Sequence, residues 1–466
     1  MRKETNMKFA KKMLVCAVLA LQILSLGVFF TSCGSTKNVE PVHVDSVEDF
    51  TRRNLSNGIP VIFKQNKGSK IIVFRMIFEG GTSTIDKSVG GIEDLTFELI
   101  LRGSNKYSYE KIQQLEYEKS FSLTSSSGKD FSTLGFTCIQ RDLAEVLEIY
   151  ADCFKNPALL EADFNQKMKE AALAISSRKA NPSGAMSLAL SKAAFEGHPY
   201  ATTSSITEES YNNITYDLVK GIHQSLMNAL RMKIVVVGNF SSDFINSLTS
   251  ELESAFGSIP RKAFTEPIIP KIPLHMGVVR VANAQAGNTG YVSALFKAPS
   301  RDAEDYIPFA MATLYLDDLF FANVREKAGA VYSINSGVIG GRELMGVISV
   351  YKASEKKELK KIICDAINLF DGNVIARDLE QYKNRYISSI FNSSQTSSGT
   401  AATIIASMEY HGSESAYLTR SDLVRAVSAK DVIDAYKKYI EPIAKENAAQ
   451  WIVVDSEENL DDYNLY

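Results

Sequence analysis

The chain has 466 residues, of which 45% are hydrophobic and 23% are charged, a composition that excludes a disordered or fibrous protein. That length exceeds one ordinary hydrophobic core and predicts more than one domain. Without the first 32 residues, which hold five Lys or Arg and one Glu, 46 basic and 53 acidic residues remain, a balance of −7. Because phosphate binding needs a basic face, this balance argues against nucleic acid as a partner.

Residues 1–32 have the pattern of an export signal. Basic residues come first, the apolar run "MLVCAVLALQILSLGVFF" follows, and small residues lead to Cys33. The stretch "FTSCGS" resembles a bacterial lipobox, which predicts a signal peptide of the lipoprotein type, lipidation of Cys33 and a polar tether over residues 33–50. An uncleaved membrane anchor is the alternative, because the run is long enough to span a bilayer. Either reading places the protein in the cell envelope, and the lipobox favours a lipid anchor at the periplasmic face of the outer membrane.

Three cysteines remain beyond the signal and Cys33, namely Cys138, Cys153 and Cys364. Their number is odd and their spacing is never C-x-x-C, so neither a disulfide framework nor a Cys-based zinc site is expected. Cys153 lies beside an apolar helical stripe, where a buried thiol is the simplest interpretation.

The body alternates short β-rich runs with helical patterns and therefore predicts an α+β fold. In "RDLAEVLEIYADCFKNP", Asp142 is a plausible N-cap. The apolar residues that follow it recur at helical spacing and predict one buried face, made by Leu143, Val146, Leu147, Tyr150 and Phe154.

The sequence contains an internal repeat of one structural unit. A shift of 216 residues carries the apolar face of this helix onto "ELKKIICDAINLFDGN", and a shift of 217 residues carries the strand "KIVVVGN" onto "QWIVVDS". A stretch with four prolines, residues 259–276, lies between the two copies and predicts a stiff linker. The expected domains are therefore residues 51–258 and residues 277–466.

An ordered set of motifs resembles the M16 metallopeptidases, the insulinase, pitrilysin and mitochondrial processing peptidase group. The motifs are "NLSNGIPVIF", "FRMIFEGGTSTID", "VGGIEDLTFELILRGS", "FEGHPY", "KIVVVGNF" and "VREKAGAVYSINSG". The resemblance implies two homologous αβ domains, each a mostly antiparallel sheet covered by helices.

Active members of this family carry H-x-x-E-H on the helix that "VGGIEDLTFELILRGS" resembles, with two His zinc ligands, a Glu general base and a further Glu ligand downstream. On this chain those positions hold Asp94, Phe97, Glu98 and, for the distal ligand, Ile175. Phe97 cannot take a proton from water and Ile175 has no lone pair, so no catalytic residue is expected.

No metal or other cofactor is expected in this chain, and zinc is expected only in an active partner subunit. Asp94 and Glu98 lie four residues apart and could hold a hard cation weakly, although acidic residues early in a helix are explained by the helix dipole alone. The closest pair of the five histidines is 25 residues apart, so the sequence contains no H-x-x-x-H motif.

The resemblance also implies a role for the second half. In two-subunit members, the zinc-free subunit supplies an Arg and a Tyr, seven residues apart, that reach the substrate. Arg325 and Tyr332 in "VREKAGAVY" match this spacing, with Gly329 between them where helix turns into strand. Both side chains can donate hydrogen bonds to a peptide carbonyl. The alternative is that each is satisfied locally at a helix end and on a strand.

"FSLTSSSGKDFSTLGFTCI" predicts a strand after a turn at Ser127–Gly128, because Leu134, Phe136 and Cys138 alternate with polar residues. The family's corresponding edge strand receives extended peptide by β-augmentation. An ordinary sheet strand is an equally good interpretation.

Together these features predict a catalytically inactive M16-like lipoprotein that serves as the substrate-binding subunit of a zinc metalloendopeptidase complex. Its expected partners are an active M16 subunit or a second copy of itself, a peptide substrate, and the membrane through the lipid. The alternatives are an active metalloendopeptidase with an atypical metal site and a structural envelope scaffold.

Overall fold

The computed structural model describes residues 46–465. The predicted signal peptide and Cys33 lie outside these residues. The described chain begins with a short 3₁₀ turn, Val47–Asp49, that leads directly into the first strand at Phe50.

The N-terminal half is built on a six-stranded sheet in the order β1-β2-β6-β3-β5-β4, in which only the β2–β6 pair is parallel among the described strands. Its strands are β1 (Phe50–Asn54), β2 (Pro60–Gln65), β3 (Ile71–Glu79), β4 (Ser122–Ser127), β5 (Phe131–Ile139) and β6 (Met232–Gly238). Its helices are α2 (Ile92–Ile100), α3 (Tyr109–Lys119), α4 (Leu143–Lys155), α5 (Glu161–Ala180), α6 (Pro182–Phe195), α7 (Glu208–Tyr211), α8 (Tyr216–Leu226) and α9 (Ser242–Phe256).

The C-terminal half is built on a five-stranded sheet in the order β7-β11-β8-β10-β9. Its strands are β7 (Gly277–Ala282), β8 (Gly290–Lys297), β9 (Val331–Gly340), β10 (Leu344–Ala353) and β11 (Gln450–Asp455). Its helices are α10 (Tyr306–Phe320), which continues as a π-helix over Phe321–Lys327, α11 (Leu359–Asn368), α12 (Gly372–Ser393), α13 (Ser397–His411), α14 (Arg420–Ala426), α15 (Ala429–Ala435), which continues as a π-helix over Tyr436–Ile440, and α16 (Glu441–Lys445).

The predicted repeat is confirmed in three dimensions. The order β7-β11-β8-β10-β9 reproduces β2-β6-β3-β5-β4, and the parallel β7–β11 pair corresponds to β2–β6. A shift of 216 residues carries the start of α4 onto that of α11, and a shift of 218 residues carries the start of β6 onto that of β11. The α+β fold with two mostly antiparallel sheets is therefore confirmed, and residues 260–276 between the halves form neither helix nor strand.

Local periodicity also predicts the elements correctly. α4 begins at Leu143, directly after Asp142, and all five residues of its predicted apolar face are buried. Cys153 is fully buried. In β5, Leu134, Phe136 and Cys138 point into the core, and a turn at Gly128 joins this strand to β4.

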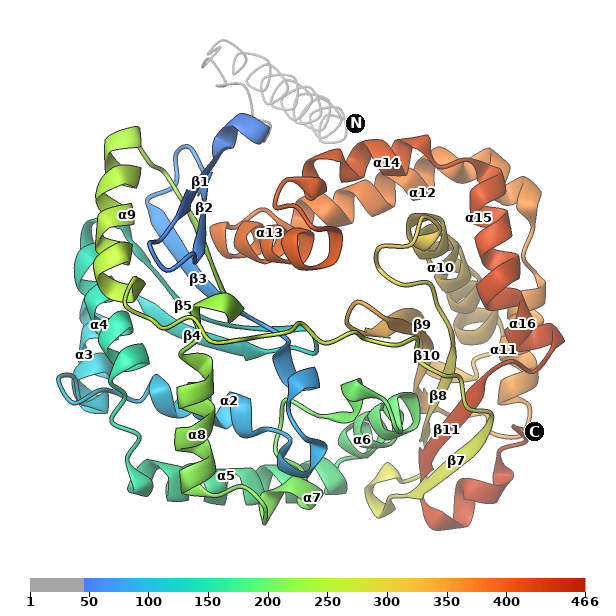
Figure 1. Cartoon of the computed structure of the whole chain (residues 1–466). Coiled ribbons are helices and arrows are strands. Elements are labelled where there is room, and N and C mark those ends of the chain that lie inside the picture. Colours follow the sequence, from blue (N-terminus) through green and yellow to red (C-terminus); the bar gives the residue numbers. More distant parts are fainter. Residues whose placement is uncertain (1–45, 466) are drawn as a thin grey trace, which may run out of the picture. The chain divides into compact units, whose positions relative to one another are not determined.

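Each half contributes a helix to the other half's sheet (Figure 1). α13 lies on β3 and β6 of the first sheet, where Ile404 and Ile405 pack against Val73 and Val235. α6 lies on β8 and β11 of the second sheet. The 216-residue shift carries α6 onto α13, so this exchange of helices follows the repeat and buries a second apolar face of each sheet.

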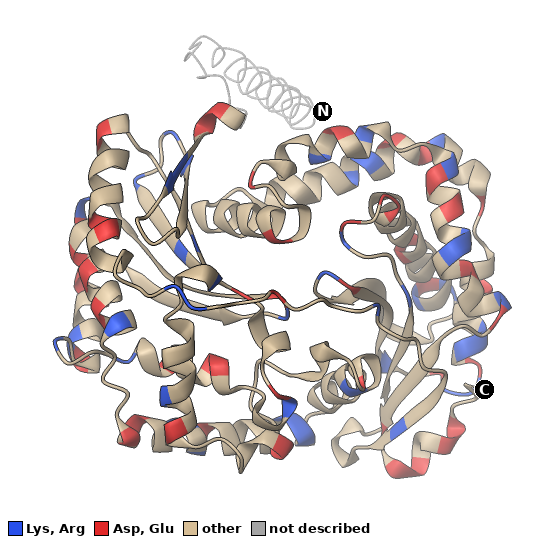
Figure 2. Cartoon of the chain, viewed as in Figure 1, with Lys and Arg blue, Asp and Glu red and all other residues tan. Residues whose placement is uncertain are grey.

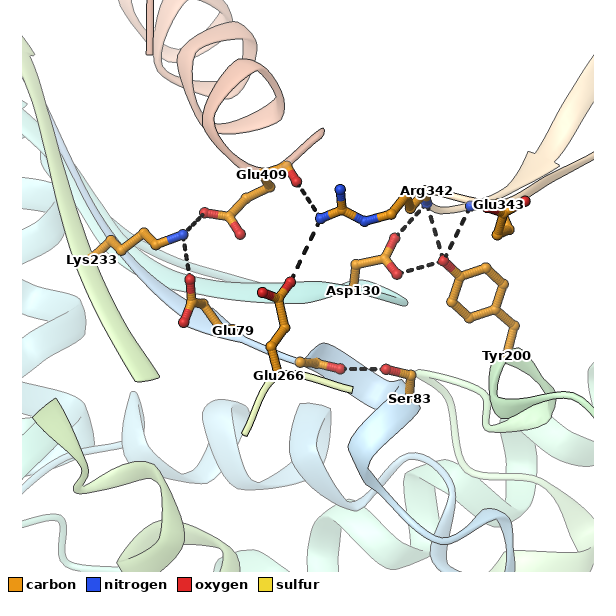
Figure 3. A network of polar contacts seen from close by, with 10 residues as sticks. Glu79, Ser83, Asp130, Tyr200, Lys233, Glu266, Arg342, Glu343 and Glu409 are labelled. Atoms are coloured by element: carbon orange, nitrogen blue, oxygen red, sulfur yellow. Dashed lines mark hydrogen bonds and ion pairs between the residues drawn. The ribbon is translucent and has the colours of Figure 1, made fainter. Parts of the chain in front are cut away.

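The two halves also meet through equivalent hairpins (Figure 3). The β9–β10 turn reaches Asp130 in the β4–β5 turn, and the backbone N–H of Arg342 donates to the Asp130 carboxylate at 2.7 Å. Nearby, Lys233 of β6 forms ion pairs with Glu79 and with Glu409 of α13. Polar contacts thus accompany the two apolar interfaces.

One helical stretch in the described chain, Tyr306–Lys327, is long and apolar enough to cross a membrane by length and composition. Phe309, Leu316 and Phe320 from this stretch pack in the core of the C-terminal half. This packing accounts for its apolar character.

Candidate functional site

The helix that resembles a metal-binding helix is α2, and its start is fixed by glycine. Gly91 precedes it with φ of 90°, a left-handed conformation that residues with a Cβ rarely adopt. A Cβ at this position would also lie 2.3 Å from the backbone nitrogen of Ile206, so the loop after α6 is packed directly against the helix start. Asp94 then lies in the first turn, and Phe97 and Glu98 lie in the second.

Phe97, at the predicted position of the general base, belongs to the hydrophobic core. Its side chain is 0% exposed, and its ring lies 5.4 Å from the ring of Phe78 on β3. A buried aromatic pair of this kind contributes to stability through packing. This side chain therefore faces the sheet and not a water-filled site.

The two carboxylates have partners that belong to this chain. Asp94 accepts a hydrogen bond from the hydroxyl of Ser127 at 3.2 Å, and Glu98 forms an ion pair with Lys167 of α5 at 3.1 Å. Burial, followed by the nearby Glu98 carboxylate, raises the pKa of Asp94. Burial works to lower the pKa of Lys167, but its paired carboxylates, Glu98 and Glu170, outweigh burial and raise it. The Lys167 ammonium therefore supplies positive charge beside Glu98.

Ile175, at the position of the distal ligand, lies on α5 two helical turns after Lys167. Its side chain packs against the core of the N-terminal half and lines a cavity of about 350 Å³ between α5, α6 and the loop before α7. The structure places Asp94, Glu98 and Lys167 close together and gives Ile175 an apolar contact.

The donor set does not suit a zinc ion. Within residues 46–465, no group of three or more His, Cys, Asp or Glu side chains is arranged to hold a metal. Two carboxylates, one of them ion-paired with Lys167, lack the imidazole and third ligand that zinc sites use.

Beside this helix lies a sheet edge with which no described strand pairs. β4 is the last strand of the first sheet and pairs on one side with β5. Its final residue, Ser127, bonds to Asp94, so the edge of the sheet runs next to the motif positions of α2. The backbone groups on the outer side of such a strand can pair with an extended peptide.

Arg325 and Tyr332 lie in the C-terminal half on either side of a tight bend. Arg325 is on the π-helical end of α10, with its guanidinium 5.2 Å from the ring centre of Phe321 and its Nε 3.6 Å from Glu326. Tyr332 is on the edge strand β9 and is 66% exposed. Gly329, with φ of 59°, makes the bend between helix and strand, as the sequence predicts. Both side chains present donors to solvent.

Sequence reasoning does not find Lys167 or Ser127 as members of this site. Neither occupies a motif position, and Ser127 comes from a different element of the chain from α2. Cys33, the predicted lipidation site, lies outside the described residues.

Comparison with known proteins identifies the family. Residues 61–208 match the model of the insulinase family, peptidase family M16, and residues 213–386 match the model described as the peptidase M16 inactive domain. The chain is 23% identical over 177 residues to the alpha subunit of the mitochondrial-processing peptidase of Solanum tuberosum. That match covers 38% of this chain and only 33% of the potato protein.

Solved structures share the fold at low sequence identity. A structure described as a peptidase M16 inactive domain from Pseudomonas fluorescens has a TM-score of 0.74 at 17% identity, over 87% of this chain and 98% of that one. The periplasmic protease PqqL of Escherichia coli has a TM-score of 0.73 at 14% identity, over 89% of this chain and 47% of that one.

The matched models account for both halves of the repeat, in the order in which the sequence presents them. The chain belongs to the M16 peptidase family.

Proposed function

We propose that this protein is a catalytically inactive M16 subunit that binds extended peptide for a zinc-bearing partner. The observation that carries the proposal is the content of the motif positions. Phe97 is fully buried in the core, and Glu98 is neutralised by Lys167. A site rebuilt in this way has no general base and no place for a metal cation beside Glu98.

The rest of the molecule keeps what peptide binding requires. Among the described strands, only β5 pairs with β4, whose outer side lies beside α2, and the N–H of Leu123 in β4 donates to Glu116. Arg325 and Tyr332 offer exposed donors in the C-terminal half. Backbone pairing tolerates many sequences, and the two donors suit a peptide carbonyl or the oxyanion that forms from it in a partner's site.

The partner in this proposal is an active M16 subunit with H-x-x-E-H, or a second copy of this chain in a peptide-binding role. Figure 2 shows acidic and basic residues interspersed on the elements of both halves. Such a surface suits a protein or peptide partner better than a polyanion.

The first experiment measures zinc content and peptidase activity of the purified protein, alone and mixed with an H-x-x-E-H homologue from the same genome. We expect no stoichiometric zinc, no cleavage by the protein alone, and faster cleavage in the mixture. Close to one zinc per chain together with chelator-sensitive cleavage would overturn the proposal in favour of an active enzyme.

A double variant separates peptide binding from scaffolding. We expect Arg325→Ala with Tyr332→Phe to reduce the gain in cleavage rate of the mixture by about tenfold or more. The double variant loses one charged and one neutral hydrogen-bond donor. The matched control is Arg425→Ala with Tyr117→Phe, because both side chains are exposed on other helices. Equal activity of the two double variants would favour a scaffold.

We also propose that the protein is exported and held by a lipid on Cys33 at the periplasmic face of the outer membrane. Its sequence before residue 46 supports this location. Cys33→Ala should abolish incorporation of labelled fatty acid and shift the protein to the detergent-poor phase. Unchanged labelling would contradict the anchor.

A further inference from the structure

A cavity in the C-terminal half is lined by two arginines that form no ion pair with a described residue. It has a volume of about 250 Å³ and lies between α12, α13 and the segment that leads into α14. Arg301 and Arg420 both line it, and Asp and Glu are absent from the described residues around it. Within residues 46–465, neither guanidinium lies within 4.0 Å of a carboxylate oxygen.

Each guanidinium is held by tyrosines instead. Arg301 lies 5.1 Å from the ring centre of Tyr410 and contacts the hydroxyl of Tyr306 at 3.5 Å. Arg420 lies 5.6 Å from the ring centre of Tyr306 and donates to the hydroxyl of Tyr386 at 3.1 Å. Stacking on aromatic rings fixes the plane of a guanidinium and leaves its remaining N–H groups free for another acceptor.

The histidine of the cluster does not neutralise these charges. His411 Nε2 lies 3.2 Å from an N–H of Arg420, and an arginine can only donate, so Nε2 accepts. Burial, followed by Arg420, lowers the pKa of His411. The imidazole is therefore neutral and adds no charge to the site. The smaller cavity thus has two guanidiniums and no carboxylate among its described lining residues, while Asp302 acts on His411 from the adjoining cavity.

The nearest carboxylates are engaged elsewhere or lie outside the cavity. Asp130 accepts hydrogen bonds from Tyr200 and Arg342, and Glu409 pairs with Lys233. Asp302 lines a second, adjoining cavity and not this one.

The adjoining cavity has a volume of about 650 Å³ and shares four residues with the first, Arg301, Tyr306, His411 and Arg420. Beyond these residues it is lined by apolar side chains that include Ile307, Leu423 and Val427. Five acidic residues also line it, together with Lys438, which pairs with Asp305; they are Asp302, Glu304, Asp305, Asp431 and Asp434. A molecule with an anionic end and an apolar body would match the two cavities together.

We infer that Arg301 and Arg420 form an oxyanion-binding site, which takes a ligand whose carboxylate or phosphate group enters the smaller cavity while an apolar body occupies the larger one. Two guanidiniums can donate several N–H groups to one planar or tetrahedral oxyanion. The smaller cavity supplies further donors, the hydroxyls of Ser407 and Tyr410, whereas the Ser389 hydroxyl donates to the carbonyl of Tyr386. The site is separate from β4 and α2 and stands whether or not the peptide-binding proposal holds.

Calorimetric titration of the purified protein tests this inference with a matched pair of probes, N-acetyl-leucine and N-acetyl-leucinamide. They share one body and differ in the carboxylate. We expect the acid to bind in the millimolar range or tighter, and the amide to bind at least about tenfold more weakly. Inorganic phosphate is the third probe. Competition by phosphate would assign the site to oxyanions in general, and acid binding without such competition would assign it to carboxylates.

The variant to compare is Arg420→Gln, because Arg301 also donates to the carbonyl of Gly341 and so supports the β9–β10 hairpin. Arg425→Gln is the matched control, since Arg425 is exposed on the same helix and lies outside both cavities. We expect Arg420→Gln to weaken acid binding at least about tenfold and Arg425→Gln to leave it unchanged.

Tyr386→Phe keeps the test decisive should Arg420→Gln fail to fold. It removes only the hydroxyl that positions Arg420, and we expect it to weaken the binding of N-acetyl-leucine several-fold. Equal binding of acid and amide, no saturable binding of any probe, or equal affinity in the Arg420→Gln and Arg425→Gln variants would each overturn the inference.

Discussion

The carboxylate of Asp130 accepts the backbone N–H of Arg342, a residue 212 positions later in the chain. The same carboxylate accepts the hydroxyl of Tyr200, and that hydroxyl accepts the N–H of Arg342 at 3.1 Å (Figure 3). A turn of the C-terminal half is therefore hydrogen-bonded to a turn and a loop of the N-terminal half. Asp130 is only 9% exposed, so these bonds replace water for all three groups.

Asp130→Ala should destabilise the protein and loosen the contact between the halves. The substitution leaves the Tyr200 hydroxyl without its acceptor and the N–H of Arg342 with only the Tyr200 oxygen, which costs about 1–3 kcal/mol of unfolding free energy. Chemical denaturation measures this loss. Hydrogen exchange should also become faster in the β9–β10 turn.

Asp461→Ala is the control, because Asp461 is exposed near the C-terminus. An Asp130→Ala protein as stable as this control would show that the contact between the turns contributes nothing to stability.

The approach of the two turns also demands a glycine at position 341. A Cβ there would lie 1.9 Å from an oxygen of Asp130 and 2.8 Å from the Tyr200 hydroxyl. Gly341→Ala should therefore push the hairpin away and cost about 1–3 kcal/mol, as overpacking does in other interiors.

Gly337→Ala on the same hairpin is the matched control. A Cβ at Gly337 meets nothing within 4 Å, so its effect should stay within about 0.5 kcal/mol. Thermal unfolding of the two variants side by side makes the comparison, and equal melting temperatures would contradict the close approach.

The sequence predicts what depends on local pattern. The face of α4 and the alternation along β5 repeat at the spacing of a helix and a strand, and the 216-residue shift appears in those same apolar residues. The exchange of α6 and α13 could not be predicted in this way. Their partners lie in the other half of the chain, and a contact across that separation has no local periodicity.

The candidate site, too, could be predicted from the sequence only in part. The expectation that the metal ligands are lost rests on the residues at the predicted motif positions alone, since Phe97 and Ile175 cannot serve as base or ligand. The contacts that these residues make instead could be found only from the structure, because Lys167 reaches Glu98 from a different helix. The roles of Arg325 and Tyr332 stay predictions.

Replacement of Phe97 by Ala should reveal it as a core residue. Deletion of a fully buried phenylalanine leaves a cavity and costs about 3–5 kcal/mol. Phe391→Ala is the control, because Phe391 is 59% exposed, and it should have little effect. Urea denaturation compares the two. Similar midpoints for both variants would mean that Phe97 faces a solvated site after all.

The stability of the protein should rise with pH just above neutrality because of Lys129. Burial lowers the pKa of Lys129 to about 8, while in the unfolded chain a lysine titrates near about 10.4. Below pH 8 the ammonium is present in both states and its desolvation destabilises the fold. Between the two pKa values the folded state releases the proton and the unfolded state keeps it, so stability increases with pH. The neutral amine can still donate to the carbonyls of Tyr200 and Thr202.

Lys129→Met removes this titration, and the exposed Lys111→Met is its control. Above pH 8, the free energy of unfolding of the wild type should increase relative to that of Lys129→Met by up to about 1.4 kcal/mol for each pH unit. Many tyrosines have raised pKa values and therefore lower the stability as pH rises near pH 10. The comparison between the two proteins cancels this contribution. Denaturant titrations from pH 7 to pH 10 measure the difference. A constant gap between wild type and Lys129→Met would show that the ammonium keeps its proton in the folded protein.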